Sequence, residues 1–172
     1  MIDGNERQEK RRKQLRLPNY DYSQNGAYYM TICTHNRVSL FGIVKSVGAH
    51  PCVRPNAAGV MVKEKLFSLA EKYEGVKIDY YCIMPNHIHF VLVKEGAHAG
   101  APLHEMIKWY KTQTTNEYIK LVKQNILPPF DKHIWQRNYY EHIIRGEEDL
   151  YEIRKYIENN PAKWFFDKYF HE

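Results

Sequence analysis

Alternating and continuous apolar segments predict the strands of this chain. Residues 28–34 are rich in residues that favour strands and predict a buried first strand. Residues 77–84 and 87–94 are two more such segments, and the turn at Pro85-Asn86 predicts that they pair as a hairpin. We expect a second, shorter hairpin within residues 38–47. Residues 48–56 contain two prolines and are predicted to form a loop or an insertion.

Helical spacing of apolar residues marks three further segments. Residues 57–73 predict a helix that stops before Gly75, and residues 103–123 predict a second helix with a lysine-rich surface. Pro128-Pro129 then breaks the chain, and residues 134–144 are predicted as another strand. Gly146 precedes three acidic residues that suit a helix N-terminus, so a last helix is expected from there to about Asn160, before Pro161.

The order of these elements is β, α, β-β, α, β, α, and it predicts an α+β fold. We expect a ferredoxin-like antiparallel sheet with helices packed over one face. The 172 residues suit one domain and are too few for a large α/β barrel. Residues 17–172 are therefore predicted to be a single domain, preceded by a basic flexible arm at residues 1–16.

Composition narrows the classes of function. Lys and Arg exceed Asp and Glu by 25 to 20, a balance that suits a polyanionic partner without requiring one. Three widely spaced cysteines without a Cys-x-x-Cys pair support neither a disulfide framework nor a cysteine-based zinc site. No apolar run approaches the ~20 residues of a membrane span, and the N-terminus does not read as a secretory leader. We expect a cytoplasmic protein with no membrane partner.

His87 and His89 are the first candidates for chemistry. Side chains two residues apart on a strand point to the same face, about 6.5 Å apart along the chain, so both imidazoles can reach one metal ion. The alternative is a pair of half-buried structural histidines.

The last helix adds two candidates. Leu150, Ile153 and Ile157 form an apolar stripe that should pack on the sheet, and Tyr156 and Asn160 flank it one turn apart. Docking would present a phenol beside the histidines and an amide oxygen that completes a His-His-Asn site. The alternative is that Tyr156 is a boundary residue and Asn160 a helix cap.

Two segments resemble a known family. Residues 84–90, Met-Pro-Asn-His-Ile-His-Phe, resemble the HUH motif (His, hydrophobic, His) of single-tyrosine transposases. Residues 135–145 and 156–161 resemble the REP-associated tyrosine transposases of the IS200-like family, and the resemblance extends over about residues 17–164. It departs from that pattern at residues 48–56, which look lengthened, and in the short segment after Pro161.

The resemblance implies a function and a site. It implies a metal-dependent single-stranded DNA endonuclease and transposase, with His87, His89 and Asn160 as ligands of Mg²⁺ or Mn²⁺ and Tyr156 as the nucleophile. Attack of Tyr156 near a DNA hairpin would give a 5′-phosphotyrosine and a free 3′-OH, followed by strand rejoining. The implied partner is single-stranded DNA with REP-like hairpins, met at the nucleoid of a prokaryotic cell. Monomer and helix-exchanged homodimer both remain open.

DNA contacts are expected from basic and aromatic residues. A solvated surface is the alternative for the cations, and core packing for the tryptophan. These candidates are Arg11, Arg12, Lys13, Arg16, Lys108, Lys111, Trp135 and Arg137.

Two rival functions stay in view. One is a non-catalytic module that binds nucleic-acid hairpins, which would be indifferent to Tyr156→Phe. The other is a small-molecule metal hydrolase, which would need an additional acidic ligand or base; Asp79 and Glu95 are not at an obvious ligand spacing.

Overall fold

A four-stranded antiparallel sheet forms the centre of the molecule. The computed structural model describes residues 17–170 except 19, 48–49 and 97–99. Arg11, Arg12, Lys13 and Arg16, and the predicted basic arm with them, lie outside the described residues. The strands lie in the order β4-β5-β1-β6. Their bounds are Gly26–Cys33 for β1, Val76–Met84 for β4, His87–Lys94 for β5 and Tyr140–Ile144 for β6.

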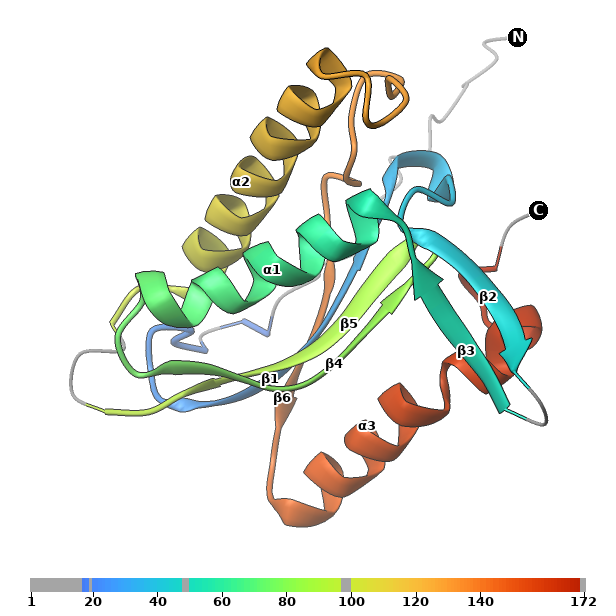
Figure 1. The fold of residues 1–172 in the computed structure, drawn as a ribbon. Coiled ribbons are helices and arrows are strands. Elements are labelled where there is room, and N and C mark those ends of the chain that lie inside the picture. Colours follow the sequence, from blue (N-terminus) through green and yellow to red (C-terminus); the bar gives the residue numbers. More distant parts are fainter. Residues whose placement is uncertain (1–16, 19, 48–49, 97–99, 171–172) are drawn as a thin grey trace, which may run out of the picture.

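Helices cover both faces of this sheet (Figure 1). Helix α1 (Ala57–Lys72) and helix α2 (Leu103–Lys123) lie together on one face, and α3 (Glu147–Asn159) lies on the other. The predicted α+β class and the ferredoxin-like β-α-β-β-α-β order are confirmed, with α1 and α2 over one face. The third helix is an addition to that arrangement, because it occupies the face that the other two leave open.

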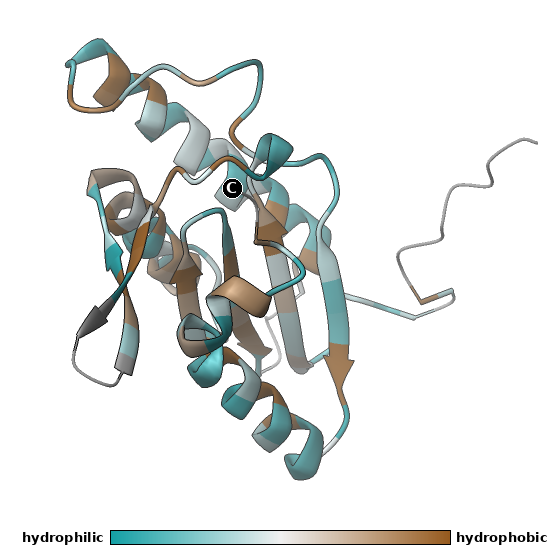
Figure 2. Ribbon diagram, turned by 90° about the vertical axis from the view of Figure 1, so that its right-hand side faces the viewer, coloured by the Kyte–Doolittle hydropathy of each residue, from teal (hydrophilic) through white to brown (hydrophobic). Residues whose placement is uncertain are grey.

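Alternation along the central strands explains why both faces are buried. On β1, Tyr28 and Met30 point toward α1 and α2, whereas Tyr29 points toward α3. On β5, Phe90 faces the first core, and the next residue along the strand, Val91, faces the second. Figure 2 shows α3 below the sheet as a mostly hydrophilic helix, so only its narrow apolar stripe is available for packing.

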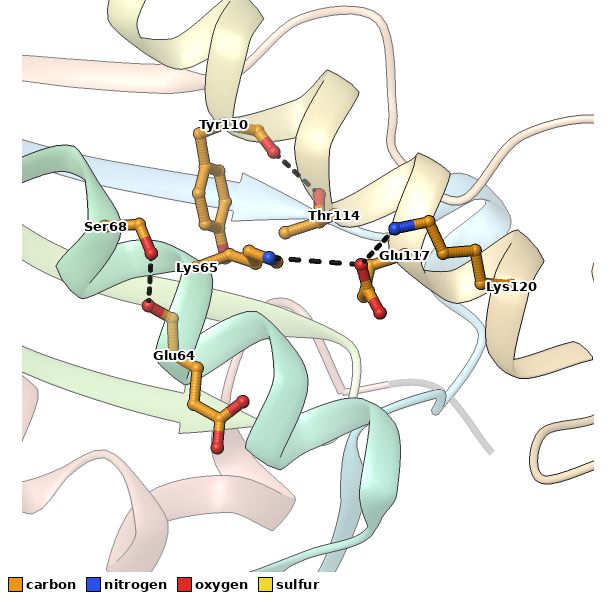
Figure 3. A network of polar contacts seen from close by, with 7 residues as sticks. All are labelled: Glu64, Lys65, Ser68, Tyr110, Thr114, Glu117 and Lys120. Atoms are coloured by element: carbon orange, nitrogen blue, oxygen red, sulfur yellow. Dashed lines mark hydrogen bonds and ion pairs between the residues drawn. The ribbon is translucent and has the colours of Figure 1, made fainter. Parts of the chain in front are cut away.

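Polar contacts join α1 to α2 at their outer surface (Figure 3). The Glu117 carboxylate of α2 lies 3.0 Å from Lys120 Nζ on the same helix and 3.9 Å from Lys65 Nζ on α1. Beneath them the Tyr110 hydroxyl donates to the Val62 carbonyl, 3.0 Å away. These contacts fix the two helices as one layer above the sheet.

The prediction of a loop at residues 48–56 is wrong. Residues Gly42–Val47 (β2) and His50–Pro55 (β3) form a separate two-stranded antiparallel sheet, so the hairpin predicted within residues 38–47 is in fact built from these two strands. Each strand of a two-stranded sheet has an open edge, where a proline's missing N–H removes no ladder bond. Pro51 and Pro55 are therefore compatible with β3, although they argued against a strand in the sequence.

The strand predicted over residues 134–144 is shorter than expected. Only Tyr140–Ile144 (β6) pairs with β1, and Trp135 makes an isolated bridge with Thr34. Residues 134–139 instead run alongside α2, and Ile134 and Trp135 of this segment are buried in the first core. The apolar residues of this segment are thus buried by a helix rather than by a sheet. None of the described helices is long and apolar enough to cross a membrane.

Candidate metal centre and tyrosine helix

His87 and His89 lie at the start of β5, on the face that α3 covers. Both imidazoles are fully buried, and their Nε2 atoms are 2.9 Å apart. The prediction that the two rings share one face and converge on one point is confirmed by this distance. Two imidazole nitrogens directed at the same small volume are the first part of a metal site.

Asn86 sets the orientation of His87. The Asn86 side chain is fully buried, and its Nδ2 donates to the carbonyls of Arg37 (3.1 Å) and Tyr169 (2.8 Å). Its Oδ1 must therefore accept from His87 Nδ1, 2.8 Å away. With Nδ1 protonated, His87 Nε2 carries the lone pair that a metal needs.

His89 is held from the other side by two hydroxyl groups of β1. Its Nδ1 lies 2.8 Å from Tyr29 Oη and 2.8 Å from Thr31 Oγ1. Hydroxyls can donate or accept, so this pair fits either tautomer of the ring. His89 can accordingly release its Nε2 proton without losing its neighbours.

Burial keeps both imidazoles neutral. Desolvation, with smaller contributions from the cations Arg37 and Lys168, lowers the pKa of His87 to about 3, despite the opposing effect of the Asn160 side chain. Desolvation also lowers the pKa of His89 well below its ordinary value, with smaller contributions from His87 and Lys168. Neutral imidazoles are the form that binds metal ions.

Helix α3 docks as its apolar stripe predicts. Ile157 is fully buried in the second core, with Leu150 and Ile153 packed against it. Arg154 fastens the helix to the edge strand β4 through two contacts with the Asp79 carboxylate, at 2.8 and 2.6 Å. Gly146, with a φ of +93°, makes the sharp turn from β6 into α3, a conformation that side chains disfavour.

This docking brings Tyr156 and Asn160 to the histidines. Asn160 is 2% exposed, its Nδ2 lies 3.3 Å from His89 Nε2, and its buried Oδ1 has no hydrogen-bond partner among the residues that the structure describes. The Tyr156 ring lies 5.4 Å from the His89 ring, and the residue is 42% exposed. Asn160 is also the C-cap residue of α3, as the helix-cap alternative predicted. Its backbone caps the helix, while its side chain lies against His89.

A segment after the η2 helix (Pro161–Phe166) adds a residue that the sequence analysis missed. Asp167 offers a carboxylate oxygen that lies, with one nitrogen each of His87 and His89, inside a group whose atoms are all within 4.8 Å of one another. The Tyr169 ring lies 4.7 Å from the His87 ring. No sequence motif marks Asp167, and only the turn of the chain through Pro161 brings it back to the sheet.

Tyr156 is a neutral phenol in this environment. Burial raises its pKa, the Asp167 carboxylate adds to that shift, and Lys168 opposes it. A cation close to the ring is therefore needed to favour the phenolate.

The residues present fit a divalent metal ion. Two neutral imidazoles and the Asp167 carboxylate lie close together, and the Asn160 amide lies beside them, with Nδ2 near His89 and a buried oxygen that has no hydrogen-bond partner among the described residues. An unpartnered buried oxygen is costly, and a cation would satisfy it. Carboxylate and amide oxygens beside imidazole suit Mg²⁺ or Mn²⁺, and imidazole also accepts zinc.

The predicted DNA-binding residues occupy different environments. Lys108 and Arg137 are exposed. Lys111 Nζ is directed inward, where it donates to the carbonyls of residues 136, 137 and 138 at 3.0, 3.3 and 3.5 Å, and burial lowers its pKa to about 8. Trp135 is 6% exposed and donates from Nε1 to Thr114 Oγ1, so its ring offers no face to a base in this conformation.

The acidic candidates of the hydrolase alternative are engaged elsewhere. Asp79 pairs with Arg154, and Glu95 pairs with Lys77 at 2.8 Å on the surface. Asp167 is the carboxylate that lies with the histidines.

Comparison with known proteins agrees with this arrangement. The family model described as "Transposase IS200 like" matches residues 23–160. An uncharacterized protein of Haemophilus influenzae is 32% identical over 169 residues, covering 91% of this chain and 92% of its own. A second Haemophilus influenzae protein, described as a REP-associated tyrosine transposase, is 34% identical over 85 residues, which are 48% of this chain and 47% of that protein.

Solved structures share the fold. A REP-associated tyrosine transposase bound to a REP hairpin matches with a TM-score of 0.61 and 20% identity, over 89% of this chain and 76% of that one. A structure from Deinococcus radiodurans described as a transposase matches with a TM-score of 0.50 and 19% identity, over 84% and 97% of the two chains. Because the family model spans most of the chain and the first relative is similar along nearly its whole length, the chain belongs to the family of IS200-like transposases.

Proposed function

We propose that the protein is a metal-dependent single-stranded DNA endonuclease and transposase with Tyr156 as its nucleophile. The observation that carries this proposal is the meeting of three groups at one place. The Nε2 atoms of His87 and His89 converge, the buried Asn160 amide lies against His89, and the half-exposed Tyr156 ring lies against His89 as well. A phenol that is open to solvent on one side and adjacent to a cation site on the other suits attack on a phosphodiester.

The residues of this chain would divide the work as follows. Neutral His87 and His89 would hold the ion together with Asn160, and Asp167 is a further candidate ligand. When bound, Mg²⁺ or Mn²⁺ would polarise the scissile phosphate and stabilise negative charge nearby. Burial raises the pKa of Tyr156, and Lys168 opposes that rise and so also favours the phenolate.

The proposed reaction conserves the energy of the cleaved bond. The Tyr156 oxygen, after losing its proton, bonds to phosphorus, and the bond from phosphorus to the 3′ oxygen breaks. That oxygen takes up a proton and leaves as a free 3′-OH, while the 5′ phosphate stays on the tyrosine. Attack of another 3′-OH on this linkage would rejoin strands and release Tyr156 without a nucleotide cofactor.

One chain supplies the whole proposed site. Tyr156 and Asn160 come from α3, which packs against the β4 and β5 strands of the same chain, where the two histidines lie. The proposed first cleavage thus uses residues that one chain supplies. The proposed substrate is single-stranded DNA beside a REP-like hairpin, in keeping with the hairpin in the structure of the related transposase.

A covalent adduct tests the proposal. Protein would be incubated with end-labelled hairpin oligonucleotides with single-stranded flanks, drawn from repeats near its gene, in Mn²⁺, Mg²⁺ or EDTA, and separated on a denaturing gel. We expect a metal-dependent protein–DNA adduct that is absent in Tyr156→Phe. Tyr151→Phe is the matched control, because Tyr151 lies on the same helix, is 61% exposed, and should leave the adduct intact. Tight DNA binding without an adduct in any metal would instead identify a hairpin-binding module.

Asp167 supports a second candidate function, a small-molecule metal hydrolase. A small-molecule metal hydrolase needs a carboxylate near its two histidines, and Asp167 supplies one. Metal analysis of the purified protein separates the two functions. Tightly held zinc favours the hydrolase, whereas weak, exchangeable Mg²⁺ or Mn²⁺ favours the nuclease.

A further inference from the structure

A groove runs between α2 and the segment that follows it. Its volume is about 660 Å³, and residues of α2 form one wall while residues 130–139 form the other. In Figure 1 this orange segment passes back alongside α2 before it enters β6. We call it the α2 groove, and it lies on the opposite side of the sheet from α3.

The α2 groove combines an apolar floor with a cationic rim. Ile107 and Ile134 are buried at its base, and the partly buried rings of Phe130 and Tyr139 also line it. Its rim carries exposed cations, which are Lys108, Lys132 and Arg137. No Asp or Glu is among the described residues that line it.

A second groove continues from the first toward the candidate metal centre. It has a volume of about 610 Å³ and shares Gln136 and Arg137 with the α2 groove. Its far wall is Arg37, whose guanidinium lies 5.5 Å from the Tyr169 ring centre. Tyr169 in turn lies against His87, so Arg37 connects the wall of the second groove to the proposed site through one side chain; we call the two grooves together the cationic path.

Backbone contacts keep this path in place. The carbonyl of Cys33, at the end of β1, accepts from Gln136 N at 2.9 Å, and Cys33 is the residue that pairs with His87 on β5. The inward-pointing Lys111 binds the carbonyls of residues 136–138 and so fixes the wall that both grooves share. The path is thus built by the fold rather than by scattered surface lysines.

We propose that this path binds the single-stranded flank of the DNA substrate, with a base in the α2 groove and the phosphates against Arg137 and Arg37. The proposal rests on the proposed function and deepens it by assigning a place to the strand. An apolar floor suits an unstacked base, and a cationic rim suits the backbone that joins it to its neighbours. A duplex presents phosphates outward and stacked bases inward, so it would leave the apolar floor unused.

Binding of matched oligonucleotides tests this assignment. Fluorescence anisotropy would compare a hairpin with single-stranded flanks, the same hairpin with blunt ends, and a flanked hairpin whose flank bases are replaced by abasic sites. Arg137→Ala and Lys108→Ala should weaken binding of the flanked hairpin and reduce its salt dependence, by about 0.7 in log-log slope for each lost phosphate contact. Lys123→Ala is the matched control, because Lys123 is exposed on the same helix outside the groove.

A filled groove separates base binding from charge. Asn116 is exposed and lines the α2 groove, so Asn116→Trp should block it without changing the charge. We expect about a fivefold or greater loss of affinity for the flanked hairpin, and little change for the blunt or abasic probes. Equal loss on the blunt hairpin, no loss on the flanked one, or wild-type protein that binds both hairpins equally would overturn the inference. If the Tyr156 adduct forms while Asn116→Trp has no effect on binding, the groove assignment fails and the proposed function stands. If no adduct forms but Asn116→Trp weakens binding of the flanked hairpin, the groove assignment stands and the proposed function fails.

Discussion

Replacing Asn86 by alanine tests how the candidate metal centre is organised. Asn86 is fully buried and makes three hydrogen bonds, one from His87 Nδ1 and two to the carbonyls of Arg37 and Tyr169. The alanine variant removes the acceptor that holds the Nδ1–H tautomer of His87. It also leaves two carbonyl groups without their donor. We expect the variant to fold less stably and to bind metal more weakly.

The expected magnitudes follow from these contacts. The buried His87 N–H left without its acceptor costs about 1–3 kcal/mol, and the two partly buried carbonyls cost less, so the free energy of unfolding should fall by roughly 1–3 kcal/mol. Loss of a partner that orients a metal-binding histidine lowers metal affinity by about ten- to a hundredfold. Asn159→Ala is the matched control. The Asn159 amide donates to the Lys155 carbonyl on the exposed surface of α3, and its loss should cost no more than about 0.5 kcal/mol.

Two measurements decide the outcome. Chemical denaturation gives the change in stability, and titration with Mn²⁺ followed by electron paramagnetic resonance gives the affinity. Asn86→Asp separates the two effects, because it retains the acceptor for His87 but loses both donors to the carbonyls; it should lose stability as Asn86→Ala does, yet bind Mn²⁺ more tightly than Asn86→Ala. A folded Asn86→Ala protein whose Mn²⁺ affinity is within about twofold of wild type would refute the reasoning.

The remaining predictions concern the tyrosine helix and the cysteines. In a double-mutant cycle measured by chemical denaturation, Asp79→Ala and Arg154→Ala should show a coupling energy of about 0.5–1 kcal/mol, because the ion pair is bidentate but partly exposed. Purely additive losses of stability would show that this ion pair does not hold α3 against β4. Burial raises the pKa of Cys33 to about 11 and that of Cys82 to about 12, so both stay protonated thiols. Alkylation followed by mass spectrometry should label Cys52 first, with Cys33 and Cys82 slow from neutral pH up to about pH 9; rapid labelling of either at pH 8 would contradict their burial.

The secondary structure of the central sheet could be predicted because local pattern and tertiary packing agree there. The apolar run around His87 and His89 predicts a buried strand, and β5 is buried on both faces. The stripe on α3 predicted its docking, which in turn brought Tyr156 and Asn160 to the histidines. Side-chain periodicity indicated which face of each element these residues occupy, whereas their roles came from the family resemblance and remain proposals.

The failures have a different physical origin. Pro51 disfavours a strand in isolation, but β3 tolerates it because an edge position leaves no ladder bond to lose. Asp167 lies near the histidines only because η2 turns the chain back toward the sheet, and the sequence around Asp167 does not indicate that turn. Lys111 and Trp135 remain predicted DNA contacts that line the α2 groove, but the sequence did not show that both also make inward hydrogen bonds, Lys111 to the carbonyls of residues 136–138 and Trp135 to Thr114. In each case a long-range contact decides the outcome.

The identity of the tyrosine that becomes linked to DNA is the most direct test of the proposed mechanism. Tyr169 also lies within the site, against His87, and burial raises its pKa to about 12. The measurement is proteolysis of the purified protein–DNA adduct, digestion of the DNA to a short remnant, and tandem mass spectrometry of the modified peptide. The account predicts a 5′-phosphodiester linkage on Tyr156 alone. A remnant on Tyr169, or an adduct that persists in Tyr156→Phe, would contradict it.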